Sequence, residues 1–537
     1  MQRTGFSAGS GDRMANGLPS EFFTSRLRRA TLGDVLERRA IRDSDSPAVV
    51  VHTGDQGRLN LTYGQLDGLV NRMSRSLQRQ GVGNGDVVAM MAGNGLDHIV
   101  TYYAALKIGA VFTTLNPNLT EFEITRQLES ARPRLIVAEE RLAQVVTGAV
   151  QSIVPTRTAS DSVIPGSELA VMLQEEEPIA DDWHVSEHDL AMIIYTSGTE
   201  SEPKGVRIPH RNFLIATSPA WTGERYVEHD DRFLLLAPMH TMAGVGTVTN
   251  LISVGATIVL GGSTKAVHSL ELIESERITN MSQTPTFYVR LTEHENFDRA
   301  DISSLRQAHT YGGAIPRHVT DTMSSRVPRL RWATYWGQTE LSQLGAIGYY
   351  GSQAEIPGHD QRWIGRAVPQ VEVRVVDEDD RPTEVGELIC RSPAVMEGYH
   401  GRPDLTAAVT RGGWLRTGDI VRIDQDMNLF FHDRKKDVIK SGGLNVSSLE
   451  VEGVLSRIPG IREVAVVGTP DPVWSEAVTA FIVREDGKPT DETELMAVAR
   501  RELAAFKLPK RIHYLPALPR DTQGKVLKRQ LRELAVN

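Results

Sequence analysis

The sequence predicts an α/β protein in which a large N-terminal domain of layered sheets and helices is followed by a smaller C-terminal domain. Three observations support this prediction. The 537 residues are 40% hydrophobic and 24% charged, which is enough apolar surface for several packed cores. Short Val- and Ile-rich runs alternate with helical patterns, as expected for helices packed on a largely parallel sheet. A charged segment at 434–437 (RKKD) follows two phenylalanines at 430–431, and there we place a hinge between domains 26–434 and 435–537.

The first elements follow from local patterns. Residues 1–25 mix Gly, Ser and charged residues without an apolar run, so we predict a flexible tail and neither a signal peptide nor a folded element. Residues 86–91 (DVVAMM) are typical of a buried strand, and residues 98–107 are typical of a helix. Gly109 is well placed to end that helix before the next apolar run.

Charge and cysteine content exclude several classes of function. The net charge of −9, from 68 acidic and 59 basic residues, gives no reason to expect a nucleic-acid or anionic-membrane surface. One cysteine, Cys390, cannot form an internal disulfide, which favours a reducing compartment, and we expect a cytoplasmic protein. The sequence has no apolar run of membrane-spanning length, and its last residues (LAVN) are not a peroxisomal address.

A second strand-like run, residues 190–195 (LAMIIY), leads into the loop TSGTESEPKG at 196–205. Small residues such as Gly198 let backbone N–H groups approach phosphate oxygens, and the hydroxyls of Thr196, Ser197 and Thr199 add donors. Lys204 supplies a positive point charge. The loop therefore indicates a phosphate site, with an ordinary polar loop as the alternative, because Ser/Thr/Gly loops are common.

Seven further segments raise the specificity of this interpretation. They are APMH at 237–240, YGGA at 311–314, YWGQTE at 335–340, GWLRTGD at 413–419, DRKKD at 433–437, SGG at 441–443 and QGK at 523–525. In order and spacing, from near residue 61 to residue 531, the chain resembles the acyl- and aryl-CoA synthetases of the adenylate-forming superfamily. The resemblance implies a small mobile α+β C-terminal domain, and it implies ATP or an acyl-adenylate, Mg²⁺ and coenzyme A as cofactors.

The resemblance assigns a nucleotide site. Its implied residues are Thr196, Ser197, Gly198, Thr199, Lys204, Gly313, Ala314, Trp336, Gly337, Thr339, Asp419, Arg434 and Lys525. Asp419 resembles the family carboxylate that accepts both ribose hydroxyls, and Arg434 resembles the ribose-contacting arginine. The aromatic pair at 335–336 can stack on adenine, Thr339 can donate to the α-phosphate, and Glu340 is a hard oxygen ligand suited to Mg²⁺. A core tryptophan, a surface glutamate and a solvated aspartate are the alternatives.

Two lysines are implied to act in catalysis and domain movement. Lys525 resembles the lysine that reaches the substrate carboxylate and the α-phosphate during adenylation, where its charge would neutralise the reacting oxygens. An exposed lysine after a glycine is the alternative. Lys436 sits at the family's hinge, about which the small domain swings between an adenylating and a thioester-forming pose.

The thiol channel is implied by a glycine segment. In the second pose Gly442 and Gly443 would approach the large domain and leave a slot for the pantetheine arm of CoA. A plain glycine turn is the alternative. A few residues later the family usually has proline where this chain has Ser448, and we interpret this change as a small loosening of the loop.

His240 helps to choose between branches of the superfamily. Domains that activate α-amino acids place an aspartate near this point to hold the substrate ammonium, and residues 239–244 (MHTMAG) contain none. Carboxylic acids without an α-amine are therefore favoured. The resemblance implies that His240 borders the acyl pocket with Phe287, Gly313 and Gly337, and that it moves as the thiol arrives. It also implies that the catalytic residues are His240, Lys525, Glu340 and Thr339. A merely packed histidine is the alternative.

The phosphate loop departs from the family at two positions. Glu200 stands where Thr or Ser is usual and Ser201 where Gly is usual, although some complete members also carry Glu and Ser. A carboxylate about 6 Å from one phosphate charge, at an effective dielectric of about 20, would weaken binding by roughly 3 kcal/mol. This penalty would fall on the β- and γ-phosphates, whereas screening of a solvent-facing Glu200 would remove most of it.

Three alternative functions remain open. A complete synthetase would convert acid, MgATP and CoA to a thioester, AMP and pyrophosphate. A thioesterification-only ligase would take an acyl-adenylate from a separate adenylating enzyme, and Lys525 argues against it because a chain that does not adenylate has no obvious need of that lysine. A lapsed nucleotide-binding regulatory protein is the third. The thiol acceptor is CoA or an acyl carrier protein, and family analogy suggests a monomer or homodimer.

Overall fold

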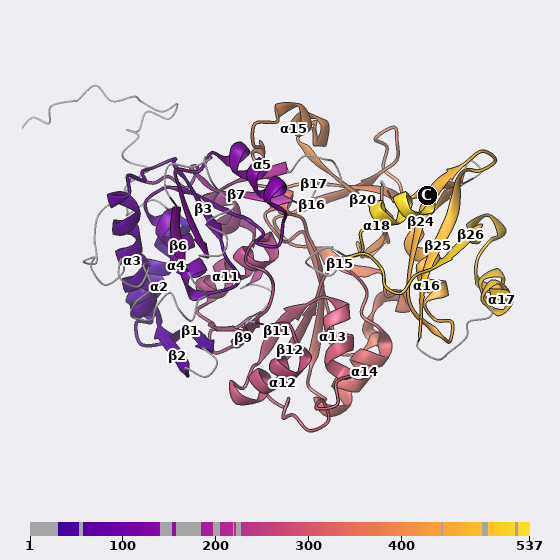
Figure 1. The fold of residues 1–537 in the computed structure, drawn as a ribbon, viewed down its shortest axis with the longest axis horizontal. Helices are drawn as coiled ribbons and strands as arrows, with labels where there is room; N and C mark the ends of the chain where they lie inside the picture. Colours follow the sequence, from indigo (N-terminus) through magenta and orange to yellow (C-terminus); the bar gives the residue numbers. More distant parts are fainter. Residues whose placement is uncertain are drawn as a thin grey trace, which may run out of the picture.

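The structure is a computed structural model that describes residues 30–52, 57–139, 153–156, 184–196, 204–217, 220–221, 227–261, 263–435, 437–441, 444–485, 492–520 and 525–536. A large N-terminal domain and a smaller C-terminal domain, drawn in yellow at one end of the molecule, are visible in Figure 1. The predicted mixed α/β architecture is therefore confirmed. None of the helices in these residues is long and apolar enough to cross a membrane.

The first sheet carries most of the candidate site. Its strand order in the described residues is β16 (Glu372–Val376), β17 (Val385–Arg391), β20 (Trp414–Ile423), β21 (Leu429–Arg434), β15 (Trp363–Ala367), β14 (Ala346–Tyr350), β13 (Arg331–Trp336), β12 (Gln307–Thr310), β11 (Asn280–Gln283), β9 (Arg232–Leu235), β10 (Thr257–Leu260), β1 (Pro47–His52) and β2 (Arg58–Thr62), and β19 (Thr410–Arg411) pairs with β20. Strands β9 to β13 are parallel, whereas β14, β15, β17, β20 and β21 pair antiparallel. The prediction of a largely parallel sheet is thus wrong for the part of this sheet formed by β14 to β21. There, short turns such as that between β20 and β21 permit only antiparallel neighbours.

The second sheet contains both strands that were predicted from apolar runs. Its order is β18 (Gly398–Tyr399), β8 (Lys204–Pro209), β7 (Leu190–Thr196), β4 (Val111–Thr114), β3 (Val87–Met91), β5 (Leu135–Glu139) and β6 (Ile153–Thr156). Strands β3 to β7 are parallel and β8 is antiparallel to β7. Because β3 and β7 are buried on both faces, most of their residues form continuous apolar runs in the sequence.

The helices of the large domain pack on these sheets. They are α2 (Leu32–Arg42), α3 (Tyr63–Arg79), α4 (Leu96–Lys107), α5 (Glu121–Ala131), α9 (His210–Asn212), α11 (Met242–Val254), α12 (Ala266–Ser275), α13 (Pro285–Thr292), α14 (Arg317–Arg326) and α15 (Pro403–Val409). Capping boxes start α2, α3 and α5. The helix predicted at 98–107 is α4, and Gly109 adopts a left-handed conformation (φ 75°) just after its end, as predicted.

The small domain has a third sheet and its own apolar core. The strand order is β23 (Leu444–Val446), β22 (Ile439–Ser441), β25 (Ser475–Arg484) and β24 (Ile461–Asp471), and β26 (Arg511–Tyr514) pairs with β25. The helices α16 (Ser448–Leu455), α17 (Glu492–Glu502) and α18 (Lys528–Val536) accompany it (Figure 1). One core cluster of this domain contains Val451, Leu455, Val466 and Leu495. The small domain therefore has an α+β architecture with a core of its own.

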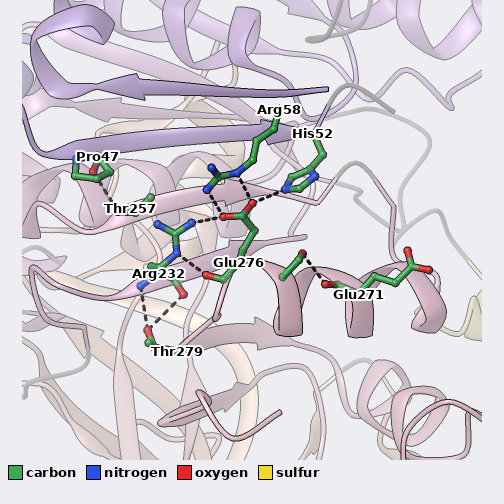
Figure 2. A network of polar contacts seen from close by, with 9 residues as sticks. Pro47, His52, Arg58, Arg232, Thr257, Glu271, Glu276 and Thr279 are labelled. Atoms are coloured by element: carbon green, nitrogen blue, oxygen red, sulfur yellow. Dashed lines mark hydrogen bonds and ion pairs between the residues drawn. The ribbon is translucent and has the colours of Figure 1, made fainter. Parts of the chain in front are cut away.

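A buried ion-pair network ties α12 to the edge of the first sheet (Figure 2). Glu276 follows α12 and is 4% exposed. Its carboxylate accepts a hydrogen bond from Arg58 Nη2 at 2.6 Å, lies 2.8 Å from His52 Nε2, and pairs with Arg232. Burial acts to raise the pKa of Glu276, but hydrogen bonds from Arg58 and His52 and the charges of both arginines outweigh it, so the pKa lies below its ordinary value.

We predict that Glu276→Gln destabilises the large domain by about 2 kcal/mol at pH 7, because it leaves two arginines without their anion. A lowered pKa in the folded state means that the ion pairs stabilise the fold above the ordinary value of 4.5 and lose this effect as the pH falls below it. Urea unfolding midpoints at pH 7 and pH 4 measure both effects. Glu271→Gln on exposed α12 surface is the control, and an equal shift in the two variants would contradict the network's role.

Candidate active site

Four parallel strands bring eight of the predicted site residues to one edge of the first sheet. Because β9, β11, β12 and β13 are parallel, their carboxyl ends lie along the same edge, where α/β proteins bind ligands. His240 follows β9, Phe287 lies in α13 after β11, and Gly313 and Ala314 follow β12. Residues 336–340 end β13 and enter a short 3₁₀ turn. The structure thus assembles segments that are far apart in the sequence.

Asp419 is the buried anchor of this edge. The residue lies on β20 and is fully buried (0% exposed). Its Oδ2 accepts hydrogen bonds from Trp336 Nε1 at 2.7 Å and from Gln338 Nε2 at 2.8 Å. Its Oδ1 lies 2.8 Å from Arg434 Nε as an ion pair, yet no hydrogen-bond partner for Oδ1 exists among the described residues. A buried carboxylate oxygen with unfilled hydrogen-bonding capacity suits a ligand that carries hydroxyl donors.

The pKa of Asp419 lies above the ordinary value of 3.8. Burial is the main cause, because desolvation disfavours the carboxylate. The charge of Arg434, the hydrogen bonds from Trp336 and Gln338, and the charge of Lys525 all oppose this effect. Lys525 therefore lies close enough to Asp419 to act on it electrostatically, although the two residues are predicted to belong to different domains.

Glu340 is held by a residue that the sequence did not single out. Tyr399 on β18 donates a hydrogen bond from its hydroxyl to Glu340 Oε1 at 2.9 Å. The ammonium of Lys204 lies 5.8 Å from the centroid of the Tyr399 ring. Strand β18 pairs with β8, which begins at Lys204, so this tyrosine joins the phosphate-loop lysine to the carboxylate after β13. Lys204 and Glu340 can therefore offer a polyphosphate one positive charge and one oxygen ligand for its metal ion.

The predicted phosphate loop, residues 196–205, connects the antiparallel strands β7 and β8. Thr196, at the end of β7, pairs with Lys204, at the start of β8. The loop residues between them, Ser197, Gly198, Thr199, Glu200 and Ser201 included, lie outside the described residues. The same holds for Lys436 and for Gly442 and Gly443. Their predicted roles therefore stay predictions.

His240 is a half-buried residue whose imidazole stays neutral at neutral pH. Burial lowers its pKa to about 4, and its Nε2 is buried without a hydrogen-bond partner among the described residues. The loop that carries it is held by Asn94, which accepts from Met239 N at 2.7 Å and donates to Ala237 O at 2.9 Å. A neutral imidazole suits hydrogen bonding to a substrate better than it suits charge stabilisation at neutral pH.

Gly337 is required by backbone packing. A Cβ on Gly337 would lie 1.5 Å from the carbonyl oxygen of Gln343. Gln343 itself has φ 101° and is held by Asn250, which donates to its Oε1 at 2.8 Å. By contrast, a Cβ on Gly313 would meet only Pro285 at 3.6 Å. Space at Gly313 is therefore compatible with a ligand, whereas Gly337 needs no ligand to explain it.

Two residues of the site were missed by sequence reasoning. Gln338 lies inside the segment YWGQTE, and only its contact with Asp419 shows what it does. Tyr399 follows Gly398 in a loop-like stretch that carries no chemical signal of its own. In both cases the partner is distant in the sequence, so no periodicity or spacing could reveal the pair.

Comparisons with known proteins agree with this arrangement. The family model described as "AMP-binding enzyme" matches residues 36–400, and that described as "AMP-binding enzyme C-terminal domain" matches residues 450–525. A feruloyl-CoA synthase of Amycolatopsis sp. is 32% identical over 94% of this chain and 99% of that protein. An indoleacetate–CoA ligase of Aromatoleum aromaticum is 31% identical over 88% of this chain and 93% of that protein.

A solved structure gives the same result for the fold. The structure described as Mycobacterium tuberculosis fatty acyl CoA synthetase superposes with a TM-score of 0.74 at 28% identity, over 94% of this chain and 98% of that chain. Both domains are therefore covered by the similarity. The segments of the sheet edge, residues 237–240, 311–314 and 335–340, fall within the first family match.

We predict that AMP binding is lost on acidification with a midpoint above 3.8, because the ionised form of Asp419 is the better acceptor. Trp336→Phe removes a donor to that ionised form and raises the midpoint further, by about one pH unit. Calorimetric titration with AMP between pH 4.5 and 8 measures the shift. The control is Trp363→Phe, whose Nε1 bonds to the neutral Asn428, and a midpoint common to both variants would contradict the role of Trp336.

Proposed function

The chain belongs to the AMP-binding enzyme family and is an acid–thiol ligase, and from this premise we propose that it joins a carboxylic acid to CoA through an acyl-adenylate intermediate. The observation that carries the proposal is the buried Asp419 with its unfilled Oδ1, under the electrostatic influence of Lys525. A nucleotide acceptor and a mobile-domain lysine at one place suit the adenylation step. Acid, ATP and CoA would yield the thioester, AMP and pyrophosphate.

In the first half-reaction, Asp419 and Arg434 would hold the ribose, with Gly313, Ala314 and Trp336 beside the base. Thr196, Thr339 and Lys204 would contact the phosphates, together with Ser197, Gly198 and Thr199. Lys525 would lie between the substrate carboxylate and the α-phosphate, whose oxygens carry the developing negative charge. The proximity of Lys525 to Asp419 supports this role.

Glu340 is the residue of this site that suits Mg²⁺. No group of three or more His, Cys, Asp or Glu side chains that could hold a metal occurs in the described part of the chain. A single carboxylate fits Mg²⁺, which is bound by one or two carboxylates plus substrate phosphates rather than by an all-protein cage. The ion would neutralise charge on the phosphates of ATP. Tyr399 then orients the carboxylate that binds it.

In the second half-reaction, CoA would enter along Gly442 and Gly443 after rotation of the small domain about Lys436. His240, Phe287 and Gly313 would border the acid, with Gly337 at the base of the pocket. The half-buried, neutral state of His240 supports a place beside an uncharged acyl group. The same state gives no support to the binding of an α-ammonium group.

The names of the similar proteins suggest the first acids to test. Two of them are named for ferulate and indoleacetate, which carry aromatic rings, and the third for a fatty acid. Ferulate, indoleacetate and a long-chain fatty acid are therefore the probes. A cytoplasmic location, a monomeric or homodimeric state, and an acyl carrier protein in place of CoA stay predictions.

We expect ATP–pyrophosphate exchange that depends on one of these acids, and thioester formation when the matching acyl-adenylate is offered with CoA. Mass spectrometry of the product separates CoA from a carrier protein as acceptor. Thioester formation without exchange would instead support the thioesterification-only ligase, and Glu200 with Ser201 would be its cause. Absence of both half-reactions with retained AMP binding would support a lapsed regulatory protein.

We predict that Tyr399→Phe raises the Mg²⁺ concentration needed for ATP binding about tenfold, the value of one charge-assisted hydrogen bond. Calorimetric titration of ATP at several Mg²⁺ concentrations measures this without turnover. Tyr514→Phe is the control, because the Tyr514 hydroxyl has no hydrogen-bond partner among the described residues. An unchanged Mg²⁺ requirement in Tyr399→Phe would show that this hydrogen bond does not orient Glu340.

A further inference from the structure

A second carboxylate at the end of β21 faces away from the nucleotide site. Successive side chains of a strand point to opposite faces, so Arg434 and Asp433 diverge. Arg434 pairs with Asp419, whereas Asp433, 2% exposed, points to the small domain. Because both residues precede Lys436, Asp433 belongs to the large domain, while the partners of its Oδ2 belong to the small domain.

Ser448 is the main partner of Asp433. Asp433 Oδ2 accepts hydrogen bonds from Ser448 N at 2.6 Å and from Ser448 Oγ at 2.7 Å. The Ser448 hydroxyl in turn accepts from Lys528 Nζ at 2.5 Å. Lys528 also pairs with Glu452 at 2.9 Å. One serine hydroxyl therefore bridges a large-domain carboxylate and a small-domain ammonium.

The interpretation of Ser448 as a loosening of the loop is wrong. Ser448 is fully buried (0% exposed) at the first position of α16, where the preceding Ser447 caps the helix and donates to His432 O at 2.7 Å. A proline at this position would lack both the N–H and the hydroxyl, and Asp433 Oδ2 would lose its two closest donors. Serine here strengthens the contact between the domains.

Lys528 lies three positions after Lys525 and begins α18. We propose that Asp433 is a positioning residue for adenylation, which acts through Ser448 and Lys528 to hold the segment of Lys525 beside Asp419. The proposal rests on the proposed function, in which Lys525 acts in the first half-reaction and the small domain then rotates about Lys436. Rotation separates Asp433 from Ser448, so the contacts favour the adenylating pose over the thioester-forming one.

The experiment compares three variants of the full chain. Ser448→Pro removes both hydrogen bonds to Asp433, and its helix tolerates proline at the first position. Ser448→Ala removes only the hydroxyl. Ser456→Ala is the matched control, because Ser456 is exposed at the other end of α16 and its hydroxyl donates only to Gly453 O within the helix. Acid-dependent ATP–pyrophosphate exchange and thioester formation from preformed acyl-adenylate are measured separately.

We expect exchange to fall about tenfold in Ser448→Pro and less in Ser448→Ala, while thioester formation is retained or faster. A purely structural role would lower both rates together. Spin labels on Asp379→Cys and Glu533→Cys, whose native side chains are 68% and 60% exposed, report the pose directly, because the native Cys390 is buried. The label distance should gain a second population in Ser448→Pro and keep one in Ser456→Ala.

Unchanged label distances in Ser448→Pro, or an equal fall of both half-reactions, would overturn the proposal. The label distances do not depend on turnover. A wild-type chain without either half-reaction would therefore refute the proposed function, while the distances would still decide whether Asp433 and Ser448 hold the pose.

Discussion

The buried carboxylate of Asp419 is the constraint on which the site depends. Burying a carboxylate costs several kcal/mol unless partners offset it, and Asp419 is contacted by Trp336 and Gln338 from the end of β13 and by Arg434 from the end of β21. Its pKa is nevertheless raised, so these partners do not compensate fully for desolvation. The remaining deficit is what a ligand with hydroxyl groups can relieve. Under the proposed function, the cost of burying Asp419 would be relieved when the ribose hydroxyls of a nucleotide bind to it.

Much of this arrangement could be predicted from the sequence, because it depends on patterns that are local. Apolar runs identified β3 and β7, and the segments at 237–240, 311–314 and 335–340 follow or end parallel strands, whose carboxyl ends lie along one edge of the sheet. The role of Gly337 was predicted only in part. Its lack of a side chain is needed for the close approach of Gln343, a contact that no pattern in the segment reveals.

What could not be predicted are pairs joined only by tertiary structure. Tyr399 and Glu340 come from different sheets, and their hydrogen bond exists because β18 adds to the edge of β8. The sequence around Ser448 shows only that a proline is absent, because Asp433, which accepts the hydrogen bonds of Ser448, is 15 residues away in the chain. In each case the role of a hydrogen-bond donor is set by a carboxylate acceptor that only the fold brings next to it.

The end of β21 therefore makes different contacts on its two faces. Arg434 pairs with Asp419, where we propose that the nucleotide binds, and Asp433 accepts from Ser448 of the small domain. A shift of this strand end changes both contacts, since adjacent residues share one backbone. Ligand binding at Asp419 that tightens Arg434 would also hold Asp433 in place, and release of pyrophosphate would remove part of that restraint. The pose of the small domain and the occupancy of the nucleotide site are then coupled through a single peptide unit, with no need for a longer pathway.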